Sequence, residues 1–341
     1  MSATPPGGRP TLEEVAARAG VSRATVSRVV NGGAGVRDTL VEKVRKAVDE
    51  LGYVPNHAAR TLVTRRNGAV AVIIAEPEFR IFSDPFFERQ VRGISRELTT
   101  FDAQLVLLWV EDSGDHERIA RYLGGGHVDG ALAFSLHDDD ELPAIIRRAG
   151  VPTVFGGRPG WTGPDGRPEV PYVDCDNRGG ARAAVRHLRA LGRERIAHIA
   201  GPRDQTSALD RLHGYHDELP DAVPELVADG DFTRASGARA MAALLERGTR
   251  LDAVFAANDL MAAGALEVLR ERGARVPDDV AVVGFDDMPA VVETTAPPLT
   301  TVRQDIEGMG RLMVRQLMRA LDGERAGALI TPTELVRRAS A

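Results

Sequence analysis

From residue 68 onward, apolar runs that suit strands alternate with amphipathic segments that suit helices, and this alternation limits the possible folds most. Helices are expected between most of the strands, for example over Asn177–Leu191 and Asp259–Arg272. Alternation of this kind builds parallel sheets joined by right-handed crossovers, so an α/β body is predicted. The predicted strands are Ala69–Ala75, Gln104–Val110, Gly130–Phe134, Val151–Phe155, Tyr172–Cys175, Arg195–Ala200, Ala253–Ala256 and Val280–Phe285.

A polar segment rich in Gly and Pro, Gly156–Pro171, divides the predicted strands into two sets. We therefore expect two similar α/β lobes with parallel sheets, a hinge and a cleft between them. The strand-like run Leu299–Arg303 and the helix Asp305–Leu321 follow the second set, and we expect them to return to the first lobe. The predicted bounds are 68–163 with 295–325 for the first lobe and 164–294 with 326–341 for the second.

Three compact helices are predicted before residue 53. Thr11 and Glu14 have the spacing of a capping box at the start of the first helix. Ser22 is placed to cap the second helix, which is expected to end at Asn31. The third helix is expected from about Asp38 to Leu51, with apolar residues spaced for burial. These elements predict a small all-α head.

The head, residues 1–52, leads into a predicted hinge, residues 53–67. Pro55 breaks the preceding helix, and residues 56–62 suffice for barely two helical turns, which are marginal alone in water. Residues 1–66 carry eleven Lys/Arg and six Asp/Glu, a net charge of +5 within a chain whose total is −6. A basic head on an acidic body indicates a polyanionic partner for the head.

The first two helices are joined by a tight turn at Gly20, which is the helix-turn-helix layout. Arg23 and Ala24 lie at the N-terminus of the second helix, and Arg28 follows about one and a half turns later. Arg binds guanine O6 and N7, and Ala contacts a thymine methyl group. A capped three-helix unit that binds no DNA has a similar pattern, but the charge and the hinge favour DNA. The residues placed for phosphate contacts are Ser22, Thr25 and Ser27.

The motifs of this chain resemble those of the LacI/GalR (lactose-repressor) family. The head contains the run TLEEVAARAGVSRATVSRVVN from Thr11 to Asn31, and ELGYVPNHAARTL from Glu50 to Leu62. Matching landmarks continue through almost the whole chain in the same order and spacing. They are Asp84–Phe87, Asp176–Gly180, Phe255–Ala262, Val283–Asp287 and Leu299–Gln304.

The resemblance implies a homodimer that binds a near-palindromic DNA operator with one head on each half-site. Arg23, Ala24 and Arg28 occupy the main base-reading positions of the family. Leu62 matches a hinge leucine that inserts into the minor groove and kinks the duplex. Hinge folding and DNA binding would then be one event. The remaining predicted DNA contacts are Asn31, Tyr53, Asn56, His57 and Ala59.

The body resembles the two-lobed periplasmic sugar-binding fold, in which a ligand between the lobes stabilises one lobe orientation. The aromatic residues that the resemblance assigns to the ligand are Phe86, Phe87 and Phe232. The polar residues that it assigns are Arg158, Arg211, Asn258, Asp286 and Gln304. Aromatic faces cover the apolar side of a pyranose, and these polar groups share its hydroxyl hydrogens. A small, sugar-like effector is therefore expected.

Structural interpretations of the same residues stay open. The three phenylalanines are alternatively core residues. Arg211 and Asp286 alternatively form a structural ion pair across the cleft. Asn258 opens a helix directly after a strand and suits an N-cap, a role that can coexist with ligand binding. Asp287 is expected to be structural or to face solvent.

One departure from the family bears on the effector. Many sugar-responsive members have an acidic residue directly before the position of Arg158, where this chain has Gly157. Without that acceptor, the two arginines of the site favour a sugar acid, a phosphorylated sugar or another anion. The insertion Trp161–Pro168 near the lobe boundary is expected to alter access to the cleft.

No enzyme, metal site or cofactor is predicted. The chain has neither a nucleophile elbow nor a strand–GxGxxG–helix unit. His137–Asp140 suits a helix-start loop better than a metal site, and Cys175 suits an inert, buried thiol. No apolar run reaches the roughly 18 residues of a membrane span, and residues 1–10 lack a signal-peptide core, so the cytoplasm is the expected location.

The predicted function is that of a ligand-responsive transcriptional regulator, in this family more often a repressor. Three alternatives fit parts of the same sequence: a regulator controlled by a protein co-effector, a sugar-binding transport protein, and a Rossmann-type enzyme. The head and the missing signal-peptide core disfavour the transport protein, and the missing dinucleotide motif disfavours the enzyme.

Overall fold

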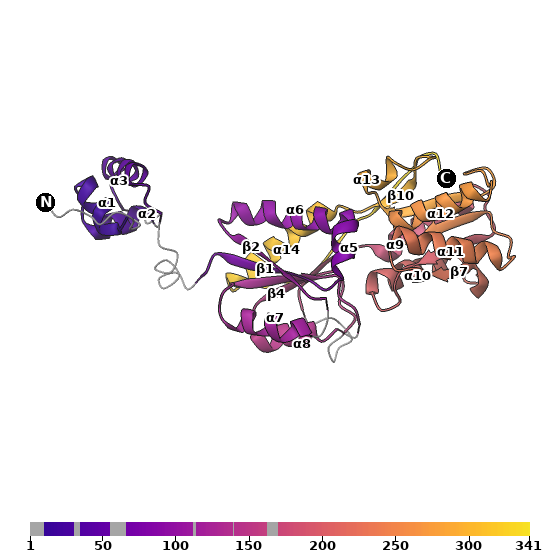
Figure 1. The fold of residues 1–341 in the computed structure, drawn as a ribbon, viewed down its shortest axis with the longest axis horizontal. Coiled ribbons are helices and arrows are strands. Elements are labelled where there is room, and N and C mark those ends of the chain that lie inside the picture. Colours follow the sequence, from indigo (N-terminus) through magenta and orange to yellow (C-terminus); the bar gives the residue numbers. More distant parts are fainter. Residues whose placement is uncertain (1–9, 31–34, 55–65, 112–113, 139, 162–169) are drawn as a thin grey trace. The chain divides into compact units, whose positions relative to one another are not determined.

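The computed structural model describes residues 10–30, 35–54, 66–111, 114–138, 140–161 and 170–341 (Figure 1). The chain divides into two compact units, residues 1–67 and 68–341. In the parts described, none of the helices is both long enough and apolar enough to span a membrane.

The first unit holds the predicted three-helix head: α1 (Leu12–Ala19), α2 (Arg23–Val30) and α3 (Asp38–Leu51). The capping box is confirmed, because the Thr11 hydroxyl accepts from the Glu14 amide and the Glu14 carboxylate accepts from the Thr11 amide. Gly20 ends α1 in the left-handed conformation, with φ 66°. One buried cluster joins the three helices: Val15, Ala16, Val26, Val44, Ala47 and Tyr53.

The second unit contains two six-stranded sheets, one in each lobe. The first sheet has the order β11-β5-β4-β3-β1-β2, and the pairs that define its register are parallel. Its strands are β1 (Ala69–Ile74), β2 (Gln104–Trp109), β3 (Gly130–Phe134), β4 (Thr153–Gly156), β5 (Tyr172–Cys175) and β11 (Ala328–Thr331).

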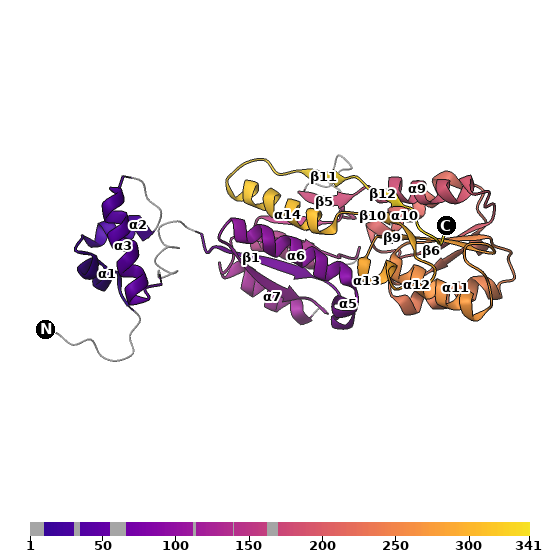
Figure 2. The same ribbon diagram turned by 90° about the horizontal axis from the view of Figure 1, so that it is seen from above.

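Helices cover both faces of the first sheet, as its continuous apolar strands require. On one face α6 (Pro85–Thr100) and α14 (Ile306–Leu321) pack side by side, as Figure 2 shows. The other face carries α7 (Gly114–Gly124) and α8 (Leu142–Ala149). The short helix α5 (Glu78–Ser83) leads into α6.

The second sheet has the order β12-β10-β9-β8-β6-β7, with β12 antiparallel to β10. Its strands are β6 (Ile196–Ala200), β7 (Val227–Asp229), β8 (Ala253–Ala256), β9 (Ala281–Asp286), β10 (Thr300–Arg303) and β12 (Glu334–Val336). The helices α9 (Asn177–Ala190) and α10 (Thr206–Glu218) pack on one face. The helices α11 (Arg234–Glu246) and α12 (Asp259–Glu271) pack on the other, and the short α13 (Pro289–Val292) precedes β10.

The lobe bounds predicted from the sequence need correction. Tyr172–Cys175 was assigned to the second lobe, but β5 pairs with β4 in the first sheet. The run 300–303 was assigned to the first lobe, but β10 pairs with β9 in the second. The segment 328–331, assigned to the second lobe, forms β11 of the first. The chain therefore crosses between the lobes after β5, after β10 and after β11. The Gly/Pro-rich segment marks a connection within the first lobe, because a loop inside a lobe has the same composition as a crossover.

Candidate functional sites

The exposed N-terminal part of α2 carries the residues predicted to read DNA. The Ser22 hydroxyl accepts from the Thr25 amide at 3.1 Å and lies 2.8 Å from the Thr25 hydroxyl, so Ser22 closes the start of α2. Arg23, Ala24 and Arg28 are exposed on this helix. The base-reading prediction therefore falls on side chains that a partner can reach.

The other predicted DNA contacts are placed differently. Tyr53 is only 7% exposed and belongs to the core of the head. Ser27 is half-buried on α2. Asn31, Asn56, His57, Ala59 and the predicted wedge Leu62 lie outside the described residues.

A cavity of about 940 Å³, counted to its open mouth, lies between the two lobes. It opens at the carboxyl ends of parallel strands, where α/β proteins place their ligand sites. All eight residues predicted to bind the effector line it: Phe86, Phe87, Arg158, Arg211, Phe232, Asn258, Asp286 and Gln304. The structure thus brings together residues that are far apart in the sequence.

Backbone strain gathers at the same cavity. Ser135, Phe232 and Asp286 line it with φ values of 59°, 64° and 111°, a region that residues other than Gly rarely adopt. Such conformations persist only where the surrounding structure enforces them, and they are common at ligand sites. This observation, which the sequence did not indicate, independently supports the cavity as the candidate ligand site.

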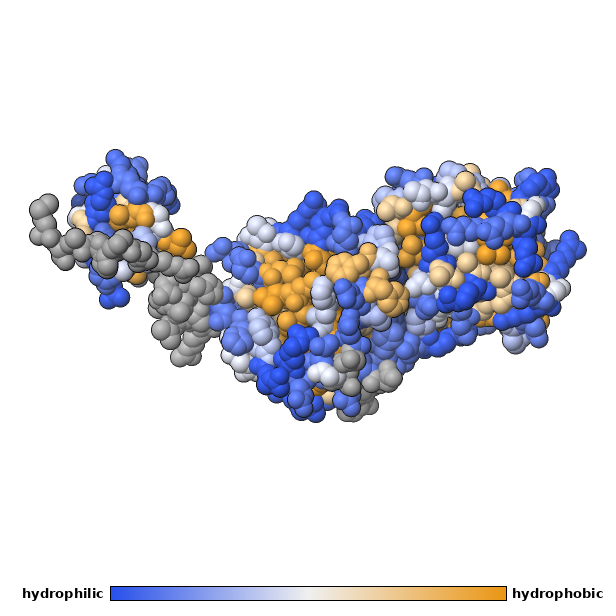
Figure 3. Space-filling model, viewed as in Figure 1, coloured by the Kyte–Doolittle hydropathy of each residue, from blue (hydrophilic) through white to orange (hydrophobic). Residues whose placement is uncertain are grey.

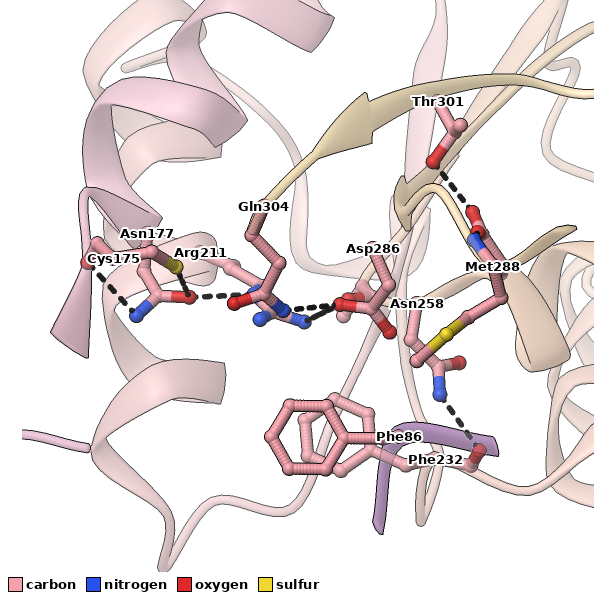
Figure 4. A network of polar contacts seen from close by, with 12 residues as sticks. Phe86, Cys175, Asn177, Arg211, Phe232, Asn258, Asp286, Met288, Thr301 and Gln304 are labelled. Atoms are coloured by element: carbon pink, nitrogen blue, oxygen red, sulfur yellow. Dashed lines mark hydrogen bonds and ion pairs between the residues drawn. The ribbon is translucent and has the colours of Figure 1, made fainter. Parts of the chain in front are cut away.

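Asp286 is the centre of the polar network drawn in Figure 4. Gln304 Nε2 donates to Asp286 Oδ1 at 2.6 Å, and Arg211 Nη1 lies 3.6 Å from the same oxygen. Burial raises the pKa of Asp286 to about 7, although the Arg211 charge opposes the shift. The ion pair that the sequence left as an alternative is therefore present, and both partners also line the cavity.

Arg211 is held by several further contacts. Its Nε donates to Asn177 Oδ1 at 2.9 Å and its Nη1 donates to the Ala257 carbonyl at 2.5 Å. Its guanidinium carbon lies 3.8 Å from the centre of the Phe285 ring. Only 5% of Arg211 is exposed. These contacts hold its side chain in place, and Asp286 partly neutralises its charge.

Asn258 has the capping role that its place in the sequence suggested. Its Oδ1 accepts from the Met261 amide at 2.9 Å at the start of α12, and its Nδ2 donates to the Phe232 carbonyl at 2.9 Å. Asn258 therefore supports the strained backbone of Phe232 as well as lining the cavity.

The predicted aromatic residues differ in their surroundings. Phe87 is 2% exposed and lies 6.3 Å from Phe134, ring centre to ring centre, so it belongs mainly to the core. Phe86 is only half-buried. Phe232 is 6% exposed. Figure 4 shows the Phe86 and Phe232 rings on one side of the polar row formed by Gln304, Arg211 and Asp286.

Arg158 has an acidic partner that the sequence did not indicate. Its Nη2 donates to Asp210 Oδ1 on α10 of the other lobe at 2.8 Å, and its amide donates to Asp174 Oδ2 at 2.8 Å. The expectation of an anionic effector came from two arginines beside the missing acceptor, and in the structure each of them pairs with a carboxylate, Arg158 with Asp210 and Arg211 with Asp286. Asp210, 52 residues away in the sequence, is thus the acidic neighbour of Arg158.

Sequence reasoning also missed a set of contacts that joins the lobes beside the cavity. His137, after β3, lies with Nδ1 2.7 Å from Asp204 Oδ2, after β6. Gln205 Nε2 donates to Glu76 Oε1 at 3.0 Å and lies 3.0 Å from His137 Nε2. The hydrogen bond to Glu76, together with Asp204, raises the pKa of His137 to about 9. The segment interpreted as a helix-start loop thus holds a charged side chain between the lobes.

Arg80 is a further cavity residue without a sequence signal. Its Nη1 donates to Glu76 Oε1 at 2.6 Å, and its guanidinium lies 5.3 Å from the Phe232 ring centre. Within the described residues, no group of three or more His, Cys, Asp or Glu side chains is arranged to hold a metal ion. Cys175 is buried, as expected.

Comparison with known proteins covers both units. The profile of bacterial regulatory proteins of the lacI family matches residues 11–56, and that of the periplasmic binding protein-like domain matches residues 185–341. The HTH-type transcriptional regulator CelR of Thermobifida fusca is 49% identical over 340 residues, 97% of this chain and 98% of its own length. The lactose operon repressor of Escherichia coli K12 is 32% identical over 341 residues, 96% of this chain and 89% of its own length.

Two solved structures are similar along the whole chain. A complex of the transcriptional regulator CelR with cellobiose is 46% identical, covers 98% of this chain and 100% of its own, and has a TM-score of 0.77. A lac repressor dimer bound to operator and the anti-inducer ONPF is 31% identical, covers 98% of this chain and 99% of its own, and has a TM-score of 0.83.

Proposed function

The chain belongs to the lacI family of bacterial regulatory proteins, and we propose that it is a transcriptional repressor whose affinity for operator DNA is controlled by a neutral sugar. It acts as a homodimer in the cytoplasm, with one head on each half of a near-palindromic operator, and without catalytic activity. The observation that carries the sugar proposal is the cavity between the lobes, where aromatic rings and buried hydrogen-bonding groups meet.

The charge balance around the cavity favours a neutral ligand. Its described lining contains Arg80, Arg158, Arg211 and His137 as cationic side chains and four aspartates, Asp84, Asp138, Asp174 and Asp286. Each of these cationic side chains already has an acidic partner within 4.0 Å. An anionic ligand would have to compete with those carboxylates. A sugar hydroxyl instead donates to a carboxylate or accepts from a guanidinium without breaking an ion pair.

Cellobiose is the neutral sugar that we propose to test first. The relative with 49% identity is named CelR, and a solved CelR complex contains cellobiose. Two of the aromatic residues that line the cavity, Phe86 and Phe232, come from different lobes, so a disaccharide bound between the lobes would stabilise one lobe orientation.

The proposal is tested by selecting operator sequences from a random DNA library with the full-length protein, at a stated salt concentration because phosphate contacts make affinity depend on salt. The selected operator is then titrated with protein in the presence of cellobiose, glucose or glucose 6-phosphate. We expect a near-palindromic motif and a change in operator affinity of about 5- to 150-fold with cellobiose, the usual range of such coupling.

Different results would replace different parts of the proposal. A response to glucose 6-phosphate but not to cellobiose would refute the neutral effector. A response to no small molecule, together with a requirement for a protein, would favour a regulator controlled by a protein co-effector. Failure to select any motif would refute the operator-binding function itself, and sugar binding without DNA binding would favour the transport protein.

A further inference from the structure

Glu13, on the first turn of α1, is in contact with the recognition helix α2. Its Oε1 lies 2.9 Å from Nε of Arg23, the first residue of α2. The two side chains are 63% and 70% exposed, so the pair lies on the surface of the head. The contact joins two elements whose relative position is set by the core of the head.

The neighbouring residue Glu14 shows that the contact between Glu13 and Arg23 is not required to cap α1. Glu14 accepts from the Thr11 amide at 2.8 Å and completes the capping box of α1. Glu13 takes no part in that box. A glutamate in the first turn suits the helix dipole, and that general role does not depend on the position of Arg23. The contact with Arg23 therefore needs a separate explanation.

The atom that Glu13 engages determines which part of the guanidinium stays available. Arginine has five N–H donors in a rigid fork, one on Nε and two on each terminal nitrogen. The closest approach of Glu13 to Arg23 is an ion-pair contact at Nε, and not at Nη1 or Nη2. Two parallel donors are what bidentate recognition of guanine O6 and N7 requires. A free arginine side chain would lose more rotamer entropy on adopting that orientation.

We propose that Glu13 is a positioning residue that determines base specificity: it orients Arg23 so that the terminal edge of the guanidinium reads guanine in each half-site. This inference rests on the proposed function, because it requires that α2 reads operator DNA. Glu13 also places a negative charge beside a DNA-binding surface. Its carboxylate therefore weakens binding to non-specific DNA, which is held mainly through phosphates.

The test is DNA-library selection with the full-length protein, followed by binding titrations on the selected operator and on a non-specific duplex. The variants are Glu13→Gln, Glu13→Ala, Arg23→Ala and the double variant Glu13→Gln/Arg23→Ala. The matched control is Glu50→Gln on α3, which removes the same charge from the head. It breaks a similar surface ion pair, that of Glu50 with Arg18.

We expect the wild type to select guanine at one position of each half-site. Both Glu13 variants lower that preference about two- to fivefold, the range for one exposed ion pair, and bind non-specific duplex more tightly. Glu50→Gln keeps the guanine preference. In the Arg23→Ala background, Glu13→Gln has no further effect on base preference, because the residue through which it acts is absent.

A merely structural role of Glu13 would lower the thermal stability of the head without changing base preference. The inference is overturned if either Glu13 variant keeps the wild-type guanine preference, or if Glu50→Gln loses it to the same extent. A wild type that selects a motif without guanine at that position overturns it as well. Selection of no motif by the wild type overturns the proposed function instead, so the two failures are distinguishable.

Discussion

Binding of a sugar effector should release a proton and strengthen as the pH rises from 6 to 8. The reason is Asp286, whose pKa burial raises to about 7. A carboxylate accepts hydrogen bonds from sugar hydroxyls, and accepting them favours its ionised form. The pKa of Asp286 therefore falls when the effector binds, and below pH 7 the side chain must lose a proton before it can accept the sugar hydroxyls as a carboxylate.

The size of the effect follows from this pKa. At pH 6 a group with a pKa of about 7 is mostly protonated, and ionising it costs about 1.4 kcal/mol, which is about tenfold in affinity. At pH 8 the group is already ionised and the cost is close to zero. His137, with a pKa of about 9, stays mostly charged over this range, and His198, with a pKa of about 3, stays neutral. Neither histidine should therefore contribute to the change of effector affinity between pH 6 and 8.

The assay is isothermal titration calorimetry with cellobiose at pH 6, 7 and 8, in two buffers that differ in ionisation enthalpy so that proton release is counted directly. Asp286→Asn should bind about 10- to 150-fold more weakly, because it loses a charge-assisted acceptor worth about 1.5–3 kcal/mol, and it should lose the pH slope. Asp287→Asn is the matched control, since Asp287 binds Arg303 and Arg338 and should leave the slope intact.

Two results would refute this reasoning. One is a wild-type affinity that is flat or that falls between pH 6 and 8. The other is an Asp286→Asn variant that keeps the wild-type slope, since the titrating group would then be elsewhere. An Asp287→Asn variant that loses the slope would show that the network as a whole, not Asp286 alone, is responsible.

Three further predictions concern other parts of the chain. Phe87→Ala should lower the free energy of unfolding in urea by about 3–5 kcal/mol because it opens the core. Phe86→Ala should mainly weaken cellobiose binding, by about tenfold, with little change in the free energy of unfolding. Equal losses of stability in the two variants would contradict the different burial of the two side chains. For His137, whose folded pKa is raised to about 9, the stabilisation should be complete below pH 6.5 and lost as the pH rises through 9. After allowance for partial exposure it amounts to about 1–2 kcal/mol, and His137→Gln should remove this loss in pH-dependent urea unfolding. Leu62→Ala, from the sequence prediction, should lose most specific operator affinity in a binding titration while cellobiose affinity stays the same; unchanged operator affinity would argue against the wedge.

Local elements of this chain were predictable because their signals are local. The capping box of Thr11 and Glu14, the glycine that ends α1 and the bounds of α3 depend on residues within one helical turn. Strands such as β3, β5 and β8 were predicted with the bounds that the structure has, because buried parallel strands are continuous apolar runs. The three strands that sequence reasoning missed, β7, β11 and β12, are short and partly exposed, and they lack that pattern.

The positions of the cavity residues proposed to bind the effector were predictable for a different reason. The motifs shared with the lacI family place Phe86, Arg211 and Asp286 at the carboxyl ends of strands or on the helices that follow, and the parallel topology gathers those ends at one cleft. The motifs did not indicate what each side chain binds. Phe87 and Tyr53 were predicted to contact ligand and DNA from their positions in the family motifs, yet both side chains are packed into hydrophobic cores.

The sequence by itself determined the class of protein: a basic helix-turn-helix head joined to an α/β sensor with its ligand residues at strand ends. Only the tertiary structure decided which lobe each crossing strand joins and which charges face one another in the cleft. Arg158 meets Asp210 across 52 residues and His137 meets Asp204 across 67, and both pairs join the two lobes. Composition and periodicity act over a few residues, whereas the charge of the cavity, and with it the proposed preference for a neutral effector, depends on contacts that exist only after the lobes come together.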